Sequence, residues 1–212
     1  MRSDLTDITV VLDRSGSMES CKQDAEGGLN SFIEEQKKQP GSAIFTLMQF
    51  DTQYEFVHKG VDLQTVGRQV LKPRGSTALL DAVGRAINET GTRLGAMNEV
   101  DRPGLVLFVI VTDGQENSSK DFQLSKIREM IQLQQNVYKW KFTFLGADQD
   151  AFAEAGAMGI HLEAVANFEK AKAGKEFAAV TRQVSRMRGQ AREGHTVDAA
   201  FTTSERQEID ED

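Results

Sequence analysis

The sequence has very few cysteines, prolines and histidines, and it has no long apolar run. Its single cysteine, Cys21, has no partner for an intramolecular disulfide, and residues 1–5 lack the apolar core of a signal peptide. Both features predict a protein of the reducing cytoplasm. The longest apolar stretch, residues 105–111, is far shorter than the roughly 20 residues that cross a bilayer. We therefore expect no membrane anchor, and we interpret this stretch as a buried strand.

The common catalytic motifs are also missing. The chain contains no G-x-x-x-x-G-K-[ST] loop, no G-x-S-x-G turn and no H-E-x-x-H helix. Its histidines, His58, His161 and His195, have no spacing typical of a zinc or catalytic site, and we assign no role to them or to Cys21. The sequence therefore predicts a protein that is not an enzyme.

The composition indicates one acidic domain with a polar end. A chain of 212 residues with 39% hydrophobic residues is long enough for one substantial core. Its net charge of −7 opposes a general attraction to nucleic acid. The apolar periodicity ends near residue 193, so we expect a domain over residues 1–193 and an acidic, disordered tail over residues 194–212.

Apolar patterns typical of strands and helices alternate along the chain. The stretches 43–50 and 54–57 are separated only by Asp51-Thr52-Gln53, which predicts an antiparallel pair at one edge of the sheet. The other strands are separated by helices, which predicts an α/β fold with a doubly wound, mostly parallel sheet and helices on both faces. Strands are expected at 8–12, 43–50, 54–57, 105–111, 138–145 and 161–165, and helices at 23–39, 78–94, 122–134, 150–155 and 168–191.

Four aromatic residues, Tyr138, Trp140, Phe142 and Phe144, alternate along the strand expected at 138–145 and would share one face of it. We interpret this stripe as core packing. A ligand-stacking role for Trp140 is the less favoured alternative.

A polar loop, Asp13-Arg14-Ser15-Gly16-Ser17, follows the first expected strand. One carboxylate and two hydroxyls at alternate positions offer hard oxygen ligands to a cation such as Mg²⁺. The alternative is that Ser15 and Ser17 only cap the helix that begins near Cys21.

Two later loops favour the metal site. Gly75-Ser76-Thr77 opens a helix in the middle of the chain, and Thr112-Asp113-Gly114 follows the strand expected at 105–111. In this order, D-x-S-x-S, G-S-T and T-D-G resemble the metal-ion-dependent adhesion site (MIDAS) of von Willebrand factor A (vWA) domains, over roughly residues 7–165. The resemblance implies metal ligands at Asp13, Ser15, Ser17, Thr77 and Asp113, with no departure from the pattern.

The resemblance also implies a function. In vWA domains the bound cation, Mg²⁺ or Mn²⁺, keeps an open position that a Glu or Asp of a protein partner completes. We therefore expect a metal-dependent protein-interaction module of the stand-alone bacterial or phage type. Similar domains in such settings act as adaptors for larger assemblies, including ATPase complexes. Two alternatives stay open, namely a Mg²⁺-dependent phosphoryl-transfer enzyme that uses Asp13 and a structural component of a larger particle, such as a viral one. Ser15 stands where such an enzyme would carry a second Asp, which argues against the first.

Other charged residues receive simpler interpretations. Asp81 either orients Thr77 from a distance or serves the helix N-terminus. Asp51 and Asp148 end strands, and we expect them to be solvated at the surface.

The last expected helix is rich in lysine and arginine, and an acidic tail follows it. The basic residues would ordinarily form a solvated face. The tail offers carboxylates that either reach the metal of a neighbouring molecule, giving self-association, or fold back on the basic helix. These carboxylates belong to Glu205, Glu208, Asp210, Glu211 and Asp212.

Overall fold

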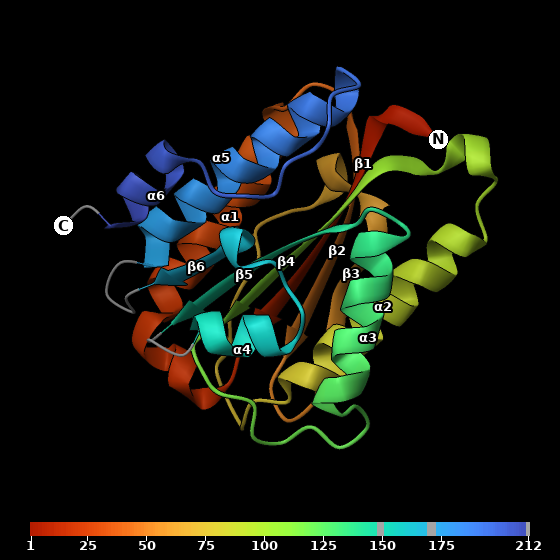
Figure 1. The fold of residues 1–212 in the computed structure, drawn as a ribbon. Helices are drawn as coiled ribbons and strands as arrows, with labels where there is room; N and C mark the ends of the chain where they lie inside the picture. Colours follow the sequence, from red (N-terminus) through yellow and green to blue (C-terminus); the bar gives the residue numbers. More distant parts are fainter. Residues whose placement is uncertain (148–150, 169–172, 211–212) are drawn as a thin grey trace.

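A computed structural model describes residues 1–147, 151–168 and 173–210 of the chain. In this part, six strands form one sheet in the order β3-β2-β1-β4-β5-β6 (Figure 1). All neighbouring strands are parallel except β2 and β3, which form the expected antiparallel edge pair. The strands are β1 (Arg2–Asp13), β2 (Ser42–Phe50), β3 (Tyr54–Asp62), β4 (Pro103–Thr112), β5 (Lys141–Ala147) and β6 (Val165–Phe168).

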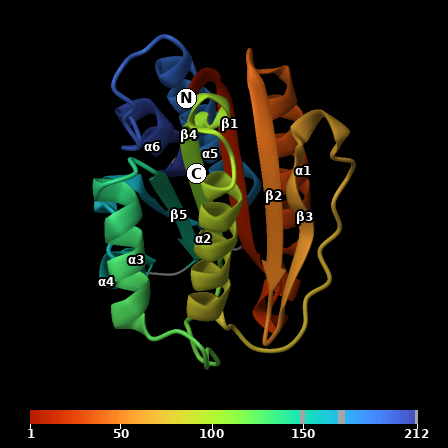
Figure 2. The ribbon, with the colours of Figure 1, turned by 90° about the vertical axis from the view of Figure 1, so that its right-hand side faces the viewer.

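Helices cover both faces of the sheet, as Figures 1 and 2 show from two directions. Side chains of α1 and α5 build the core on one face, and those of α2, α3 and α4 build the core on the other. The predicted doubly wound α/β fold is confirmed. The helices are α1 (Lys22–Lys38), α2 (Leu79–Gly95), α3 (Leu124–Asn136), α4 (Ala151–Ala157), α5 (Ala173–Arg192) and α6 (Thr203–Asp210), with short 3-10 turns η1 (Gly16–Cys21), η2 (Leu63–Thr65), η3 (Glu99–Asp101) and η4 (Leu162–Ala164). None of the helices in the described ranges is long and apolar enough to cross a membrane.

The central strand β1 is buried on both faces because its apolar residues alternate between the two cores. Ile8, Val10 and Leu12 belong to the core under α1 and α5, whereas Val11 belongs to the core under α2 and α3. Asp13 pairs with Phe50 of β2, and Leu12 pairs with Val111 of β4. This register brings the carboxyl ends of three neighbouring strands to the same edge of the sheet.

The strand β5 begins later than predicted. Tyr138 is 61% exposed and lies outside the strand, because α3 is followed by a turn in which Lys139 has a φ of 60° and the Trp140 N–H bonds the Gln134 carbonyl at 3.0 Å. The aromatic stripe therefore begins at Trp140, whose ring stacks on Phe108 with a 5.4 Å centroid separation. The core role of Trp140 is confirmed, and that of Tyr138 is wrong.

The tail is not disordered over residues 203–210, where it forms α6. Thr202 Oγ1 accepts the Glu205 N–H at 3.2 Å, and Glu205 Oε2 accepts the Thr202 N–H at 2.7 Å, which is a reciprocal capping box. The preceding Phe201 is buried in the core beside α5. The predicted disorder was wrong because local capping and one buried aromatic side chain order a segment of polar composition.

Candidate metal centre

The three predicted loops meet at the carboxyl edge of the sheet, where Figure 2 shows the β2–β3 turn, the start of α2 and the loop after β4 at its lower end. Backbone hydrogen bonds join these loops. The Gly16 N–H donates to the Gly75 carbonyl at 3.0 Å, and the Arg74 N–H donates to the Arg14 carbonyl at 2.8 Å. Gly75 has a φ of +68°, a conformation that a glycine adopts without steric cost. The first two loops are therefore fixed relative to each other.

Asp13 is fully buried at the end of β1. Its Oδ1 accepts the Ser15 N–H at 2.6 Å, and its Oδ2 accepts the Thr112 hydroxyl at 2.6 Å. Burial raises the pKa of Asp13 to about 6, and the charge of Asp113 adds to the rise, while the hydrogen bonds from Thr112 and Ser15 oppose it. Asp13 is thus a rigidly held carboxylate at a position where an uncompensated negative charge is unfavourable. A carboxylate that binds a cation is expected to have both properties.

The serine hydroxyls connect the first loop to Asp113. Ser15 Oγ lies 3.0 Å from Ser17 Oγ, and Ser17 Oγ donates to Asp113 Oδ1 at 2.6 Å. Ser15 precedes η1, but its side chain makes no capping hydrogen bond. The alternative that these serines serve only to cap a helix is therefore not supported by their contacts.

Gly114 places Thr77 in the same cluster. A Cβ atom added to Gly114 would lie 2.9 Å from Thr77 Oγ1, 3.4 Å from Ser17 Oγ and 3.9 Å from Asp13 Oδ2. Three oxygens, one from the loop of Thr77 and two from the loop after β1, therefore surround one point beside Gly114 of the third loop. Together with the contacts of Ser15 and Asp113, the structure brings all five predicted ligands to one centre.

Two residues that the sequence did not single out hold the Thr77 loop. The Thr77 N–H donates to Asn117 Oδ1 at 3.0 Å, and the Asn117 N–H returns a bond to the Thr77 carbonyl at 3.1 Å. Glu116 Oε2 accepts the Leu80 N–H at 2.9 Å and so caps the start of α2. No local spacing could have identified Asn117 and Glu116, because their partners lie about forty residues earlier in the chain.

Asp51 lies behind the centre and is buried, so its predicted surface solvation is wrong. Its Oδ2 accepts hydrogen bonds of 2.8 Å from both Arg14 and Arg74. Burial alone would raise the pKa of Asp51, but bonds from Arg74, the Gln53 N–H and Arg14 outweigh it and hold the pKa below its ordinary value. Asp148, which received the same interpretation, lies outside the described residues.

Asp81 has a different role from both that were expected. Its carboxylate accepts the backbone N–H groups of Lys120, Asp121 and Phe122, each at 2.9 Å. It thereby fastens the loop after β4 to the first turn of α2, and it makes no contact with Thr77 among those that the structure gives.

The donor set fits a hard divalent cation. It consists of two carboxylates and three hydroxyls, and the described part of the chain holds no group of three or more His, Cys, Asp or Glu side chains around a common point. Oxygen ligands of this kind suit Mg²⁺ or Mn²⁺, whereas zinc sites are built mainly from His and Cys. Cys21 is buried and outside the cluster.

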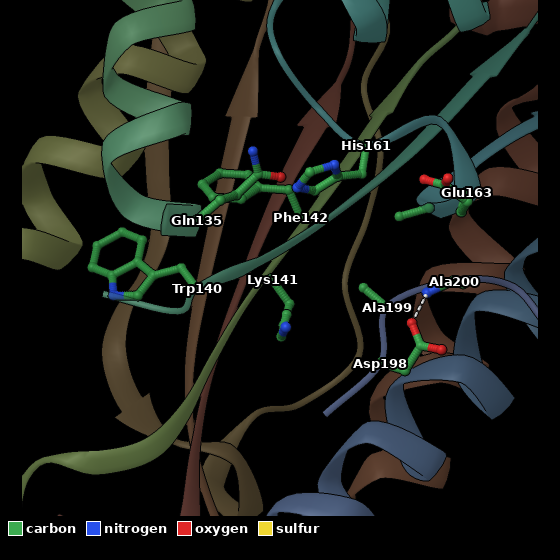
Figure 3. A pocket seen from close by; sticks show the side chains of 10 residues that line it. Gln135, Trp140, Lys141, Phe142, His161, Glu163, Asp198, Ala199 and Ala200 are labelled. Carbon is green, nitrogen blue, oxygen red and sulfur yellow. Dashed lines mark hydrogen bonds between the residues drawn. The ribbon is translucent and has the colours of Figure 1, made fainter. Parts of the chain in front are cut away.

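A separate hollow of about 360 Å³ opens at the amino end of β5, at the opposite edge of the sheet (Figure 3). In Figure 3 the Lys141 side chain and Asp198 both lie in the lower part of the view. The Trp140 ring lies at the left, apart from both of them. Burial lowers the pKa of Lys141, while the charge of Asp198 opposes this shift. His161 also lines this hollow, but none of the five predicted ligands does.

Comparisons with known proteins identify the fold. No protein-family model and no curated protein sequence matches the chain. Among solved structures, a von Willebrand factor type A structure from Catenulispora acidiphila is 16% identical and has a TM-score of 0.60, covering 85% of this chain and 42% of that chain. This chain thus spans less than half of that protein's length.

Two further structures agree. The manganese-loaded TRAP protein of Plasmodium vivax is 15% identical, with a TM-score of 0.55 over 82% of this chain and 72% of that chain. The vWF domain of the type V pili tip protein Mfa5 from Porphyromonas gingivalis is 10% identical, with a TM-score of 0.59 over 84% of this chain and 94% of that chain. At these identities, the likeness establishes that the chain has the vWA fold.

Proposed function

We propose that this chain is a protein-interaction module in which a divalent cation, Mg²⁺ or Mn²⁺, joins the domain to an acidic residue of a partner. Asp13, Ser15, Ser17, Thr77 and Asp113 would hold the cation. The observation that carries the proposal is the group of oxygens around Gly114, because two loops supply hard ligands to one small space and Asp113 of the third loop bonds Ser17 there. A manganese-loaded protein of the same fold adds support.

The exposure of the cluster supports an incoming ligand. Asp13, Ser15, Thr77 and Asp113 are buried, whereas Gly16 and Ser17 are exposed. A cation held here would be covered on the protein side and accessible on the side of Ser17. The two carboxylates only balance the charge of a divalent cation and the hydroxyls add none, so an external Glu or Asp would enter as a further oxygen ligand on the open side.

The phosphoryl-transfer alternative has less support. Both oxygens of Asp13 already accept hydrogen bonds of 2.6 Å, and Ser15 is not a second acid. Turnover of p-nitrophenyl phosphate that disappears in Asp13→Asn would favour the enzyme, whereas metal binding without turnover favours the module.

Fewer observations support the proposed biological setting than support the metal centre. A single, buried cysteine agrees with a reducing cytoplasm. The proposed role is that of an adaptor in a multiprotein assembly, such as an ATPase complex, and a fixed component of a larger particle is the alternative. Chelation would release an adaptor from its assembly and would leave a fixed structural component in place.

Partner capture from native lysate tests the function. The purified chain would be used as bait in Mg²⁺, in EDTA and as the Asp113→Ala variant, and bound proteins would be identified by mass spectrometry. We expect one set of partners in Mg²⁺ that is absent under both perturbations. Partners retained under both would contradict the proposal and would assign binding to another surface.

A further inference from the structure

We infer that a polar pocket beside the metal centre is a second subsite, which takes a carboxylate of the same partner segment whose first acid completes the metal. This inference rests on the proposed function and specifies the partner as a segment with two acidic residues. The pocket has a volume of about 430 Å³ and lies between the β2–β3 turn, the first two turns of α2 and the loop after β4. Its lining includes Tyr54, Ala78, Arg85, Ser118 and Lys120.

Residues that line the pocket are sequence neighbours of residues at the metal centre. Ala78, which lines it, directly follows the proposed ligand Thr77. Ser118, on the opposite wall, directly follows Asn117, whose backbone and side chain both bond Thr77. A partner segment that enters the metal site therefore has this pocket as its immediate neighbour.

Hydrogen-bond donors in the pocket lack acceptors. Within the described part of the chain, the buried Nε of Arg85 and the buried Oγ of Ser118 have no hydrogen-bond partner, which is costly unless a ligand supplies one. Lys120 is exposed, and its ammonium group makes no hydrogen bond or ion pair with a described residue. Because Arg85 already pairs with Asp121, the ammonium group of Lys120 is the cation without a described partner, and it favours an anionic acceptor.

The arginine is held in place for such a ligand. Its guanidinium group lies over the Tyr54 ring, 4.4 Å from the centroid, and pairs with Asp121. Asp121 is an exposed carboxylate, so a ligand carboxylate can share or replace it at Arg85. The other acid of the pocket, Asp81, is already occupied by three backbone N–H groups.

The spacing of the two acids follows from the helix. Arg85 lies six residues beyond Leu79, the first residue of α2, which corresponds to about 9 Å of helical rise. An extended peptide advances roughly 3.3 Å per residue. If this rise is taken as the separation of the two sites, the second acid is expected about three residues from the acid that binds the metal.

A peptide selection tests this inference. Random twelve-residue peptides displayed on phage would be captured by the immobilised full chain in Mg²⁺ and eluted with EDTA, so that only metal-dependent binders are sequenced. The selection would be repeated with Arg85→Gln, with Lys120→Gln and with Arg2→Gln. Arg2 is a matched control because it pairs with the exposed Asp4 at the amino end of β1, far from the pocket.

We expect peptides selected by the unmodified chain and by Arg2→Gln to carry two acids about three residues apart. For one such peptide, changing the second acid to its amide should weaken binding about tenfold to the unmodified chain and less than twofold to Arg85→Gln or Lys120→Gln. Peptides with one acid only, or a second acid whose effect is the same in every variant, would overturn the subsite alone. Absence of any EDTA-eluted peptide would instead overturn the proposed function and, with it, this inference.

Discussion

Asp13 is the residue at which a proton competes most directly with the proposed cation. Burial raises its pKa to about 6 in the metal-free protein, and metal binding requires the ionised carboxylate. We expect Mn²⁺ affinity, measured by calorimetric titration, to be nearly constant above pH 7 and to fall by up to about tenfold per pH unit below pH 6. Equal affinity at pH 5 and pH 7 would show that Asp13 does not contact the ion.

The same carboxylate affects the stability of the metal-free protein in the opposite direction. Low pH weakens metal binding, but it stabilises the metal-free fold. The folded-state pKa of Asp13 lies above the unfolded value of about 3.9, so its contribution to stability is complete below that value and is lost as the pH rises through 6. Bound metal reverses this preference, because it compensates the buried charge.

Arg14 and Arg74 form a natural comparison, since both donate to Asp51 Oδ2 at 2.8 Å. The Arg14 side chain is 7% exposed and that of Arg74 is 60% exposed. Arg14→Met should lower the free energy of unfolding by about 3 kcal/mol, because it leaves the buried carboxylate of Asp51 with an exposed arginine as its only cationic partner. Arg74→Met should cost less than about 1 kcal/mol. Urea denaturation of both variants checks this prediction, and equal losses would contradict the assigned role of burial.

At the scale of elements, ion pairs between arginines of α5 and glutamates of α6 join the two helices. Arg186 donates to Glu205 at 3.1 and 3.2 Å, and Arg182 pairs with Glu208. Of the two arrangements considered for the acidic tail, the fold-back on the basic helix is therefore the one present for Glu205 and Glu208. Self-association through the tail would have to use other acids or break these pairs.

Glu205→Ala should unfold α6, because Glu205 both completes the capping box and pairs with Arg186. We expect faster hydrogen exchange over residues 203–210 and unchanged Mn²⁺ affinity, since the helix packs chiefly against α5 and β6. Thr203→Ala, at an exposed position at the start of the same helix, serves as the control. Exchange that is equally slow in both variants would mean that capping does not order this segment.

At the scale of the whole molecule, the sequence predicted the alternation of strands and helices and, through its resemblance to vWA domains, five residues that the structure places close together. Both follow from short patterns: apolar periodicity gives the elements, and parallel strands bring their carboxyl ends to one edge. The burial of Asp51 was not predictable, because it depends on arginines in two other loops. The capping box at Thr202 and Glu205 was present as a local signal, but it was masked by the polar composition around it.

Metal binding should also stabilise the whole domain, because the centre is assembled from loops that are separated in the unfolded chain. A cation at 100 times its dissociation constant would add about 2.7 kcal/mol to the free energy of unfolding. Thermal unfolding in Mg²⁺ and in EDTA measures this difference, and Asp113→Ala should abolish it. An equal gain in that variant would place the stabilising ion elsewhere.

The most direct test of the account is the Mn²⁺ affinity of Gly114→Ala. Its new methyl group would lie 2.9 Å from Thr77 Oγ1 and fill the space between the proposed ligands, without changing any of them. Gly67→Ala is the matched control, because nothing lies within 4 Å of its added Cβ. We expect one Mn²⁺ per chain with similar affinity in the unmodified protein and Gly67→Ala, and at least about tenfold weaker binding in a folded Gly114→Ala. Equal affinity in all three proteins would contradict a cation at this centre.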